Sequence, residues 1–299
     1  MNTLAANAQQ NARMISGEPM LLLQAETSSA SASPVGSGQG ESQIQRKRVS
    51  TGISDIDPLI EGGFLVGKSY LIIGEPGTGK TIFSTQFVLK GLMNGEKAVY
   101  VAVDDKPAEI VEQASSLGWD LVQYIESRQL LILDAAPFFH MRAGLGRDRD
   151  VDVVKTVSDL SSYVKRMGAS RVVIDPVGPL IASREAANRF RENARLLVRS
   201  FQDSMATTNL LTMYSPTSSM SLEGEESPFA GVVVLRLSRR QKGLMRTLLV
   251  RKMRGTAFDL VEYKIDIVGK CGIVMGQQIP AMMQRLGEGE SLFREWRLQ

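Results

Sequence analysis

Eight consecutive residues combine glycines, a lysine and a threonine at a spacing that suits phosphate binding. They are Gly74, Glu75, Pro76, Gly77, Thr78, Gly79, Lys80 and Thr81, and they fit the pattern G-x-x-x-x-G-K-[ST]. In such a loop, backbone N–H groups point into one concavity, and the following helix adds partial positive charge. The sequence therefore predicts a site for the phosphates of ATP, with Lys80 on the β- and γ-phosphates and the Thr81 hydroxyl on Mg²⁺.

The flanks of this phosphate loop support the prediction. The apolar run over 70–73 is typical of a buried strand, and residues 81–93 have apolar side chains at helical spacing. Asn94 and Gly95 then end the helix. The alternative is a chance glycine turn between a strand and a helix. Such a turn would not be expected to have all four fixed positions of the pattern together with both flanking elements.

A candidate magnesium carboxylate follows a second apolar strand. Val172, Val173 and Ile174 are branched and apolar, and Asp175 comes directly after them. Since the carboxyl ends of parallel strands share one edge of a sheet, Asp175 is predicted to lie near the phosphate loop on the Mg²⁺ side. The alternative is an Asp that caps a turn ahead of Pro176.

The elements that must position these residues alternate along the chain. After 70–73 and 81–93, strands are expected at 98–103, 130–133, 171–174 and 210–214, and helices at 107–117, 151–167 and 187–202. Three strands at 232–237, 244–252 and 261–267 follow, with a turn at 239–243. The pattern predicts an α/β fold with a mostly parallel, helix-flanked sheet and a C-terminal antiparallel extension.

Both ends of the chain differ from this domain, which spans residues 49–276. Residues 1–48 are rich in small and polar residues and are expected to form a disordered arm that ends in Arg46, Lys47 and Arg48. The arm is either a solvated linker or a segment that docks on an anionic surface. Residues 277–299 form a mixed tail with a helical pattern around 282–286.

Composition excludes several classes of site. The 299 residues are 43% hydrophobic with a net charge of +3, too small a bias to indicate nucleic acid by itself. The single cysteine, Cys271, favours a reducing cytoplasm, and with one histidine, His140, it cannot complete the usual four-ligand zinc site. A Ser-His-Asp mechanism would have to use His140, and no nucleophile motif lies near it. No membrane span or secretory signal is expected.

Several segments around the phosphate loop match one family. They are Thr51-Gly52-Ile53-Ser54-Asp55-Ile56-Asp57, Gly62-Gly63, Ser116-Leu117-Gly118-Trp119-Asp120-Leu121, Leu131-Ile132-Leu133-Asp134-Ala135-Ala136-Pro137 and Lys252-Met253-Arg254-Gly255-Thr256. Over about residues 49–275 the chain resembles the RecA-type domain of the KaiC/RadA group. KaiC carries two such domains, and this chain has one. The resemblance implies a RecA-like P-loop NTPase core in a hexameric ring, with ATP between subunits.

The resemblance also implies roles for residues outside the loop. In the family, a Lys-x-Arg pair reaches the γ-phosphate of the neighbouring subunit's nucleotide, and here the pair is Lys252 and Arg254. The alternative is a solvated strand face. Some family members have a histidine near the adenine, and here Phe258 is the nearest match, which suggests recognition of the base by stacking.

The catalytic base departs from the family pattern. The family has two adjacent glutamates where this chain has Asp104 and Asp105. Aspartate is shorter by one methylene, on the order of 1.5 Å, and a misplacement of ~1 Å can lower a rate ~100-fold. We therefore expect slow hydrolysis. The alternative is that these aspartates cap the helix that begins at Pro107. A further departure is Thr212-Met213-Tyr214, which is more apolar than the sensor residues usual at this place.

Two other activities of the family are less well supported. The Ser-Thr pair that KaiC phosphorylates is absent, and Ser227 alone stands at the matching place, so autophosphorylation is not expected. The loop over 215–230 carries three glutamates, Glu223, Glu225 and Glu226, which oppose DNA. Arginines elsewhere keep a nucleic-acid role open; they are Arg184, Arg189, Arg191 and Arg195.

Three functions remain open at this point. The first is a slow KaiC-like ATPase whose nucleotide state controls oligomerisation and the binding of an unknown regulatory protein. The second is an ATP-bound scaffold that hardly hydrolyses. The third is a RadA-like recombinase accessory protein that binds single-stranded DNA.

Overall fold

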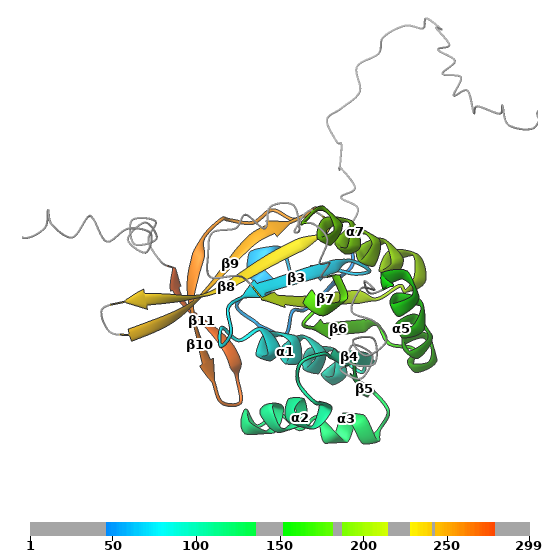
Figure 1. Cartoon of the computed structure of the whole chain (residues 1–299). Helices are drawn as coiled ribbons and strands as arrows, with labels where there is room; N and C mark the ends of the chain where they lie inside the picture. The colour runs from blue at the N-terminus through cyan, green and yellow to red at the C-terminus, as the bar shows by residue number, and fades with distance from the viewer. Residues whose placement is uncertain (1–45, 136–151, 182–186, 215–227, 241–242, 279–299) are drawn as a thin grey trace, which may run out of the picture. The chain divides into compact units, whose positions relative to one another are not determined.

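The computed structural model describes residues 46–135, 152–181, 187–214, 228–240 and 243–278. Most of them build one nine-stranded sheet in the order β11-β10-β9-β8-β3-β7-β6-β4-β5 (Figure 1). The strands are β3 (Ser69–Gly74), β4 (Ala98–Ala102), β5 (Leu130–Asp134), β6 (Arg171–Asp175), β7 (Thr208–Tyr214), β8 (Gly231–Arg240), β9 (Gly243–Met253), β10 (Glu262–Val268) and β11 (Gly272–Gln278). A separate pair joins β1 (Arg48–Val49) to β2 (Phe64–Leu65).

Helices connect the strands of the parallel part. They are η1 (Asp57–Ile60), α1 (Lys80–Met93), α2 (Pro107–Ser116), α3 (Val122–Glu126), α5 (Val153–Met167), α6 (Gly178–Ile181) and α7 (Ala187–Ser204). The pairs β3–β7, β3–β8, β7–β6, β6–β4 and β4–β5 are parallel, whereas β9, β10 and β11 pair antiparallel. The predicted α/β fold, with its parallel sheet and antiparallel extension, is therefore confirmed.

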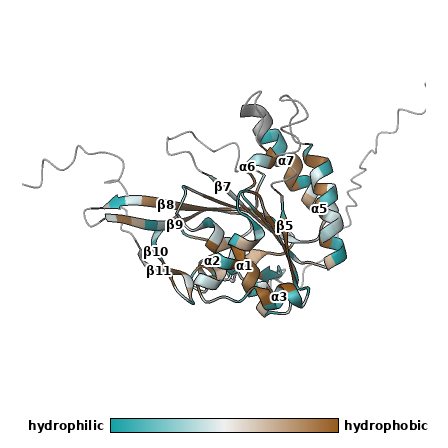
Figure 2. Cartoon of the chain, turned by 60° about the horizontal axis from the view of Figure 1, so that its bottom comes forward, coloured by the Kyte–Doolittle hydropathy of each residue, from teal (hydrophilic) through white to brown (hydrophobic). Residues whose placement is uncertain are grey.

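Two hydrophobic cores cover the two faces of the sheet. In β4, Val99 and Val101 belong to one core, and Tyr100 and Ala102 to the other, as the period of two in a strand requires. The first core contains α5 and α7 residues, and the second contains Phe83 of α1. Figure 2 shows the hydrophobic strands between these helices. Because both faces are covered, the parallel strands are almost wholly apolar.

The structure differs from the prediction in the late strands. A fourth strand, β11, follows β10, and the sequence did not indicate it because the run after Cys271 is short and interrupted by Gly276. The predicted turn over 239–243 is shorter, since Arg239 and Arg240 lie in β8 and Gly243 begins β9. Arg48, assigned to the arm, lies in β1.

Several predictions fall outside the described residues. They concern the arm over 1–45, His140, Arg184, the glutamates and Ser227 of the 215–227 loop, and the helix around 282–286. Arg189 lies in α7, but its side chain is not described, and Arg191 and Arg195 are exposed on the same helix. Among the helices described, none is long and apolar enough to cross a bilayer.

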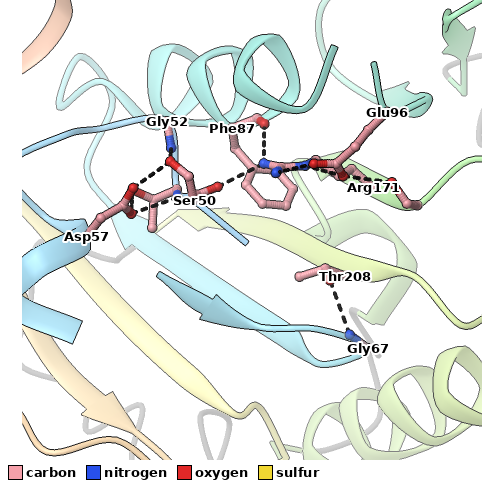
Figure 3. Close-up of polar contacts among 10 residues, drawn as sticks. Ser50, Gly52, Asp57, Gly67, Phe87, Glu96, Arg171 and Thr208 are labelled. Atoms are coloured by element: carbon pink, nitrogen blue, oxygen red, sulfur yellow. Dashed lines mark hydrogen bonds and ion pairs between the residues drawn. The ribbon is translucent and has the colours of Figure 1, made fainter. Parts of the chain in front are cut away.

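The segment that leads into β2 is fixed by a glycine and an aspartate. Gly52 has φ +88°, and an added Cβ would lie 2.3 Å from the carbonyl oxygen of Gln86 in α1, so a side chain does not fit there. The Asp57 carboxylate accepts hydrogen bonds from the Thr51 amide at 2.8 Å and from the Ser50 hydroxyl at 2.5 Å (Figure 3). This part of the family motif therefore docks the start of the domain on α1.

A buried arginine connects this segment to the sheet. Arg171 begins β6 and is 0% exposed. Its Nε and Nη2 donate to both carboxylate oxygens of Glu96, at 2.9 and 2.8 Å, and its Nη1 donates to the carbonyls of Ser50 and Phe87 (Figure 3). The guanidinium also lies 4.6 Å from the centroid of the Phe87 ring. One side chain thus links the domain entry, α1 and β6.

Replacing Glu96 by glutamine is expected to lower the free energy of unfolding by about 3 kcal/mol, because a buried charge loses its partner. The hydrogen bond from Arg171 lowers the pKa of Glu96 below its ordinary value of 4.5. Charged Glu96 therefore stabilises the fold above about pH 4.5, and this contribution is lost as the pH falls through the lower folded-state pKa. Denaturant unfolding measured between pH 7 and pH 3 tests both expectations.

The matched control is Asp266→Asn. Asp266 pairs with Lys264 at 2.9 Å, but both side chains are about half exposed, so the loss should be below about 1 kcal/mol. The Glu96→Gln protein should also lose less stability on acidification than the native protein. Equal losses of unfolding free energy for the two substitutions would show that the buried Arg171–Glu96 pair stabilises the fold no more than an exposed pair.

Candidate functional site

The phosphate loop joins β3 to α1, as the sequence predicts. Gly79 is the N-cap of α1 and has φ +106°, in the left-handed region that favours glycine. A Cβ at Gly74 would lie 2.6 Å from the Thr78 hydroxyl oxygen and 2.7 Å from the carbonyl of Leu235. The backbone therefore approaches its neighbours too closely for a side chain, and the concavity that phosphates require is kept open.

Late strands support the loop from the outside. Arg246 of β9 donates from Nε to the carbonyl of Gly77 at 2.9 Å, and Thr78 donates to the carbonyl of Glu75 at 2.8 Å. A Cβ on Gly79 would lie 3.2 Å from Ile267 of β10. The antiparallel extension thus braces the loop that precedes α1.

Lys80 is buried at the base of the loop. Its Nζ donates to the carbonyls of Gly74 and Glu75, both at 2.9 Å, and lies 4.4 Å from the centroid of the Tyr214 ring. Burial lowers the pKa of Lys80, and the charges of Asp175 and Glu75 oppose that effect. The ammonium is therefore held by groups that a phosphate oxygen can replace.

Asp175 lies at the carboxyl end of β6 and is 7% exposed. The Tyr100 hydroxyl donates to its Oδ2 at 2.6 Å, and the Thr212 hydroxyl donates to Oδ1. Burial and the charge of Asp175 raise the pKa of Tyr100 well above its ordinary value, so this phenol is a donor at neutral pH. Both carboxylate oxygens are thus oriented by hydroxyls from neighbouring strands.

Asp104 and Asp105 follow β4 at the same edge of the sheet. Asp104 accepts a hydrogen bond from the Tyr214 hydroxyl at 3.1 Å. Burial, and after it the charge of Asp175, raises the pKa of Asp105. Neither residue caps α2, because its N-cap is Lys106, whose amide donates to Glu109 at 2.8 Å. Both aspartates are therefore available to the site as carboxylates that do not cap the helix.

The donor set suits MgATP. The loop offers backbone amides and a buried cation, Thr81 is the second residue of α1, and Asp175 ends β6. Within the described residues, no three His, Cys, Asp or Glu side chains are grouped to hold a metal by themselves. A Mg²⁺ ion is usually bound through one or two protein ligands together with substrate phosphates, and Thr81 and Asp175 could supply such ligands here.

A family model described as "ATPase: KaiC" matches residues 49–279, more than half of the chain. The chain belongs to the KaiC ATPase family. The resemblance recognised in the sequence is therefore confirmed, and the chain is an ATP-binding RecA-type ATPase.

Individual relatives agree with this assignment. A UPF0273 protein of Pyrococcus horikoshii is 30% identical over 243 residues, which are 77% of this chain and 94% of the relative. The circadian clock oscillator protein KaiC of Parasynechococcus marenigrum is 31% identical over 229 residues, 73% of this chain but 42% of the relative. The crystal structure of a KaiC-like protein from Pyrococcus horikoshii, 31% identical, superposes with a TM-score of 0.66 and covers 78% of this chain and all of its own. The RecA-like core is thereby confirmed.

In this KaiC-family chain, the Lys-x-Arg pair lies away from the chain's own phosphate loop. Lys252 of β9 pairs in register with Val232 of β8, and Val232 pairs in turn with Leu71 of β3. The amide of Arg254 donates a hydrogen bond to the carbonyl of Ala230 at 2.7 Å. Since Ala230 is hydrogen-bonded to Ser69, Arg254 is level with the start of β3. Five residue steps along β3 lead from Ser69 to Gly74, which is about 17 Å at 3.3 Å per residue.

Phe258 is also apart from the loop. It is partly buried against the core and lines a pocket of about 310 Å³. The other lining residues are Pro58, Leu59, Val250, Ala257, Asp259 and Tyr263, and none of them belongs to residues 74–81. The structure therefore separates the predicted residues into a loop set and a far set.

The sequence missed the hydroxyls that orient the carboxylates. As a sequence, Thr212-Met213-Tyr214 is simply more apolar than the usual sensor residues, but in the structure the hydroxyls of Thr212 and Tyr214 both reach site carboxylates. Met213, between them, is buried in the other core. The alternation of side chains along a strand was the available signal, since residues two apart face the same side. Tyr100 gave no comparable signal.

Proposed function

We propose that this chain is a slow ATP hydrolase whose nucleotide state controls its oligomerisation and its binding to a regulatory protein. The observation that carries the proposal is the separation of two sets of functional residues. The loop set includes Lys80 and Asp175, whereas Arg254 is in register with the start of β3 and Lys252 with Leu71, midway along that strand.

Within one subunit, the loop would bind and orient the nucleotide. Amides at the start of α1 and the Lys80 ammonium would hold the phosphates, and the Thr81 hydroxyl and Asp175 would hold the magnesium ion. The ion, when bound, neutralises phosphate charge. Tyr100 and Thr212 already hydrogen-bond the two oxygens of the Asp175 carboxylate, so they would orient it before the ion binds.

Asp104 or Asp105 would accept a proton from the attacking water. Both lie in the bend just after β4, but each reaches one methylene less far than glutamate would. General-base catalysis depends on contact at about 3 Å, so a short side chain at a correctly placed backbone supports only slow turnover.

The second half of the site would come from another subunit. Arg254 is exposed and Lys252 is partly buried. Both cations lie away from the phosphate loop of their own subunit. A head-to-tail ring, such as the proposed hexamer, would bring this end of one subunit to the loop of the next. Phe258 would then stack on the base of the neighbour's nucleotide.

The proposed setting is the cytoplasm, where the exposed thiol of Cys271 would stay reduced. We assign nucleotide chemistry to residues 49–276 and leave the arm and the tail as candidate contacts for a protein partner. Arg191 and Arg195 are exposed on α7, but exposure by itself does not favour nucleic acid, so we propose no such role.

Exchanging both aspartates for glutamate, as Asp104→Glu with Asp105→Glu, is expected to raise phosphate release about tenfold, because the base gains the missing methylene. Phosphate release at saturating MgATP measures the change. Asp203→Glu, at an exposed position of α7, is the matched control and should leave the rate unchanged.

Two results would change the proposal. If the double variant were no faster than the native chain, the short side chains would not limit turnover. If the native rate did not exceed that of Lys80→Ala, the chain would be an ATP-bound scaffold and the hydrolase would be abandoned.

A further inference from the structure

Tyr214 occupies a central place beside the phosphate loop. It is the last residue of β7 and pairs in register with Gly74, the first residue of the loop. It is 47% exposed, whereas the six residues that precede it in the strand are all buried. An aromatic side chain at the open edge of the sheet has no core to fill, so its contacts need another explanation.

The ring and the hydroxyl of Tyr214 contact two different charged groups of the site, the Lys80 ammonium and the Asp104 carboxylate. The ring lies over the Lys80 ammonium, with 4.4 Å from Nζ to the ring centroid. The hydroxyl donates to Oδ2 of Asp104 at 3.1 Å. Lys80 and Asp104 are otherwise on different elements, α1 and the bend after β4, so Tyr214 is a physical link between them.

The Tyr214 hydroxyl stays protonated at neutral pH. Burial and the neighbouring charge of Asp104 raise the pKa of Tyr214 to about 12. The hydroxyl is therefore a hydrogen-bond donor at every pH at which the protein would work. Its acceptor, Asp104, is exposed, and an exposed carboxylate without such a donor would rotate among several rotamers.

The geometry points to Tyr214 as a positioning residue that holds the Asp104 carboxylate in one orientation for hydrolysis. The inference rests on the proposed function, since it takes Asp104 as the base. One oxygen of Asp104 is tied to the phenol, so the carboxylate has fewer orientations to lose when a proton is transferred to it. The hydrogen bond thus restricts the orientation of the carboxylate, although it does not lengthen its reach.

Tyr214→Phe separates the hydroxyl from the ring, because phenylalanine keeps the contact with Lys80. We expect kcat for phosphate release to fall about tenfold, while the affinity for a fluorescent ATP analogue with Mg²⁺ stays within about twofold. In an Asp104→Asn background the same substitution should have no further effect, since residues that act as a unit are not additive. Thermal unfolding should be unchanged.

Tyr163→Phe is the matched control. Tyr163 also lies under a cation, Arg166, at 4.7 Å, but on α5 and outside the site, so its hydroxyl should not affect kcat. A kcat of Tyr214→Phe equal to that of an active native chain would overturn this inference and leave the proposed function intact. An equal loss with and without Asp104 would overturn it as well. A native chain without hydrolysis above Lys80→Ala would overturn both.

Discussion

Replacing Arg254 by alanine is expected to lower the rate of phosphate release about 1,000-fold, while each subunit still binds ATP. An arginine supplied by a neighbour stabilises charge on the γ-phosphoryl group in the transition state, and its loss costs about this factor in related chemistry. The affinity for ATP depends mainly on the subunit's own loop, from which Arg254 is about 17 Å away along the sheet. Phosphate release and nucleotide binding, measured side by side, separate the two effects.

The control and the assembly measurement sharpen this prediction. Arg166→Ala removes an arginine from the end of α5, where it hydrogen-bonds its own helix, and should leave the rate unchanged. Sedimentation of the native chain should show larger oligomers with ATP than without it. A monomer under both conditions would remove Lys252 and Arg254 from the site.

Replacing Lys80 by alanine is expected to weaken MgATP binding about 10- to 100-fold and to lower phosphate release about 1,000-fold. The ammonium would make charge-assisted hydrogen bonds to phosphate oxygens, worth about 1.5–3 kcal/mol in binding and more where charge develops in the transition state. Calorimetric titration with MgATP and a phosphate-release assay measure the two losses.

Lys97→Ala is the matched control for Lys80. Lys97 is exposed just before β4, so its loss should change neither binding nor rate. Because Lys80 is buried beneath the loop, its removal also empties space next to Gly74. Lys80→Met fills that space and should give the same losses. If the methionine variant bound MgATP like the native chain, the loop would not bind nucleotide through this lysine.

The parts of the fold with strong local patterns were predictable from the sequence. Strand β3, helix α1 and the glycines between them are fixed by hydrophobic periodicity and by backbone conformations that only glycine adopts, as Gly79 shows. Asp175 was predictable because a buried parallel strand ends at it. Strand β11 was not, since its pairing with β10 is tertiary and its own pattern is weak.

The partners within the site were harder to predict. The hydroxyl of Tyr100, in β4, hydrogen-bonds Asp175, in the adjacent strand β6. Tyr214 and Asp104 also form a hydrogen bond, although they lie 110 residues apart in the chain. Such contacts depend on strand order, which the sequence alone does not determine. The buried pair of Arg171 and Glu96 likewise looked like two ordinary charges.

The central claim is that each site takes its phosphate loop from one subunit and its Arg254 from the next. It is tested most directly by mixing equal amounts of Lys80→Ala and Arg254→Ala chains with ATP and measuring phosphate release. Neither variant alone should be active, but in mixed head-to-tail rings about a quarter of the sites combine an intact loop with an intact arginine, so about a quarter of native activity should return. A mixture no more active than its separate components would contradict the claim.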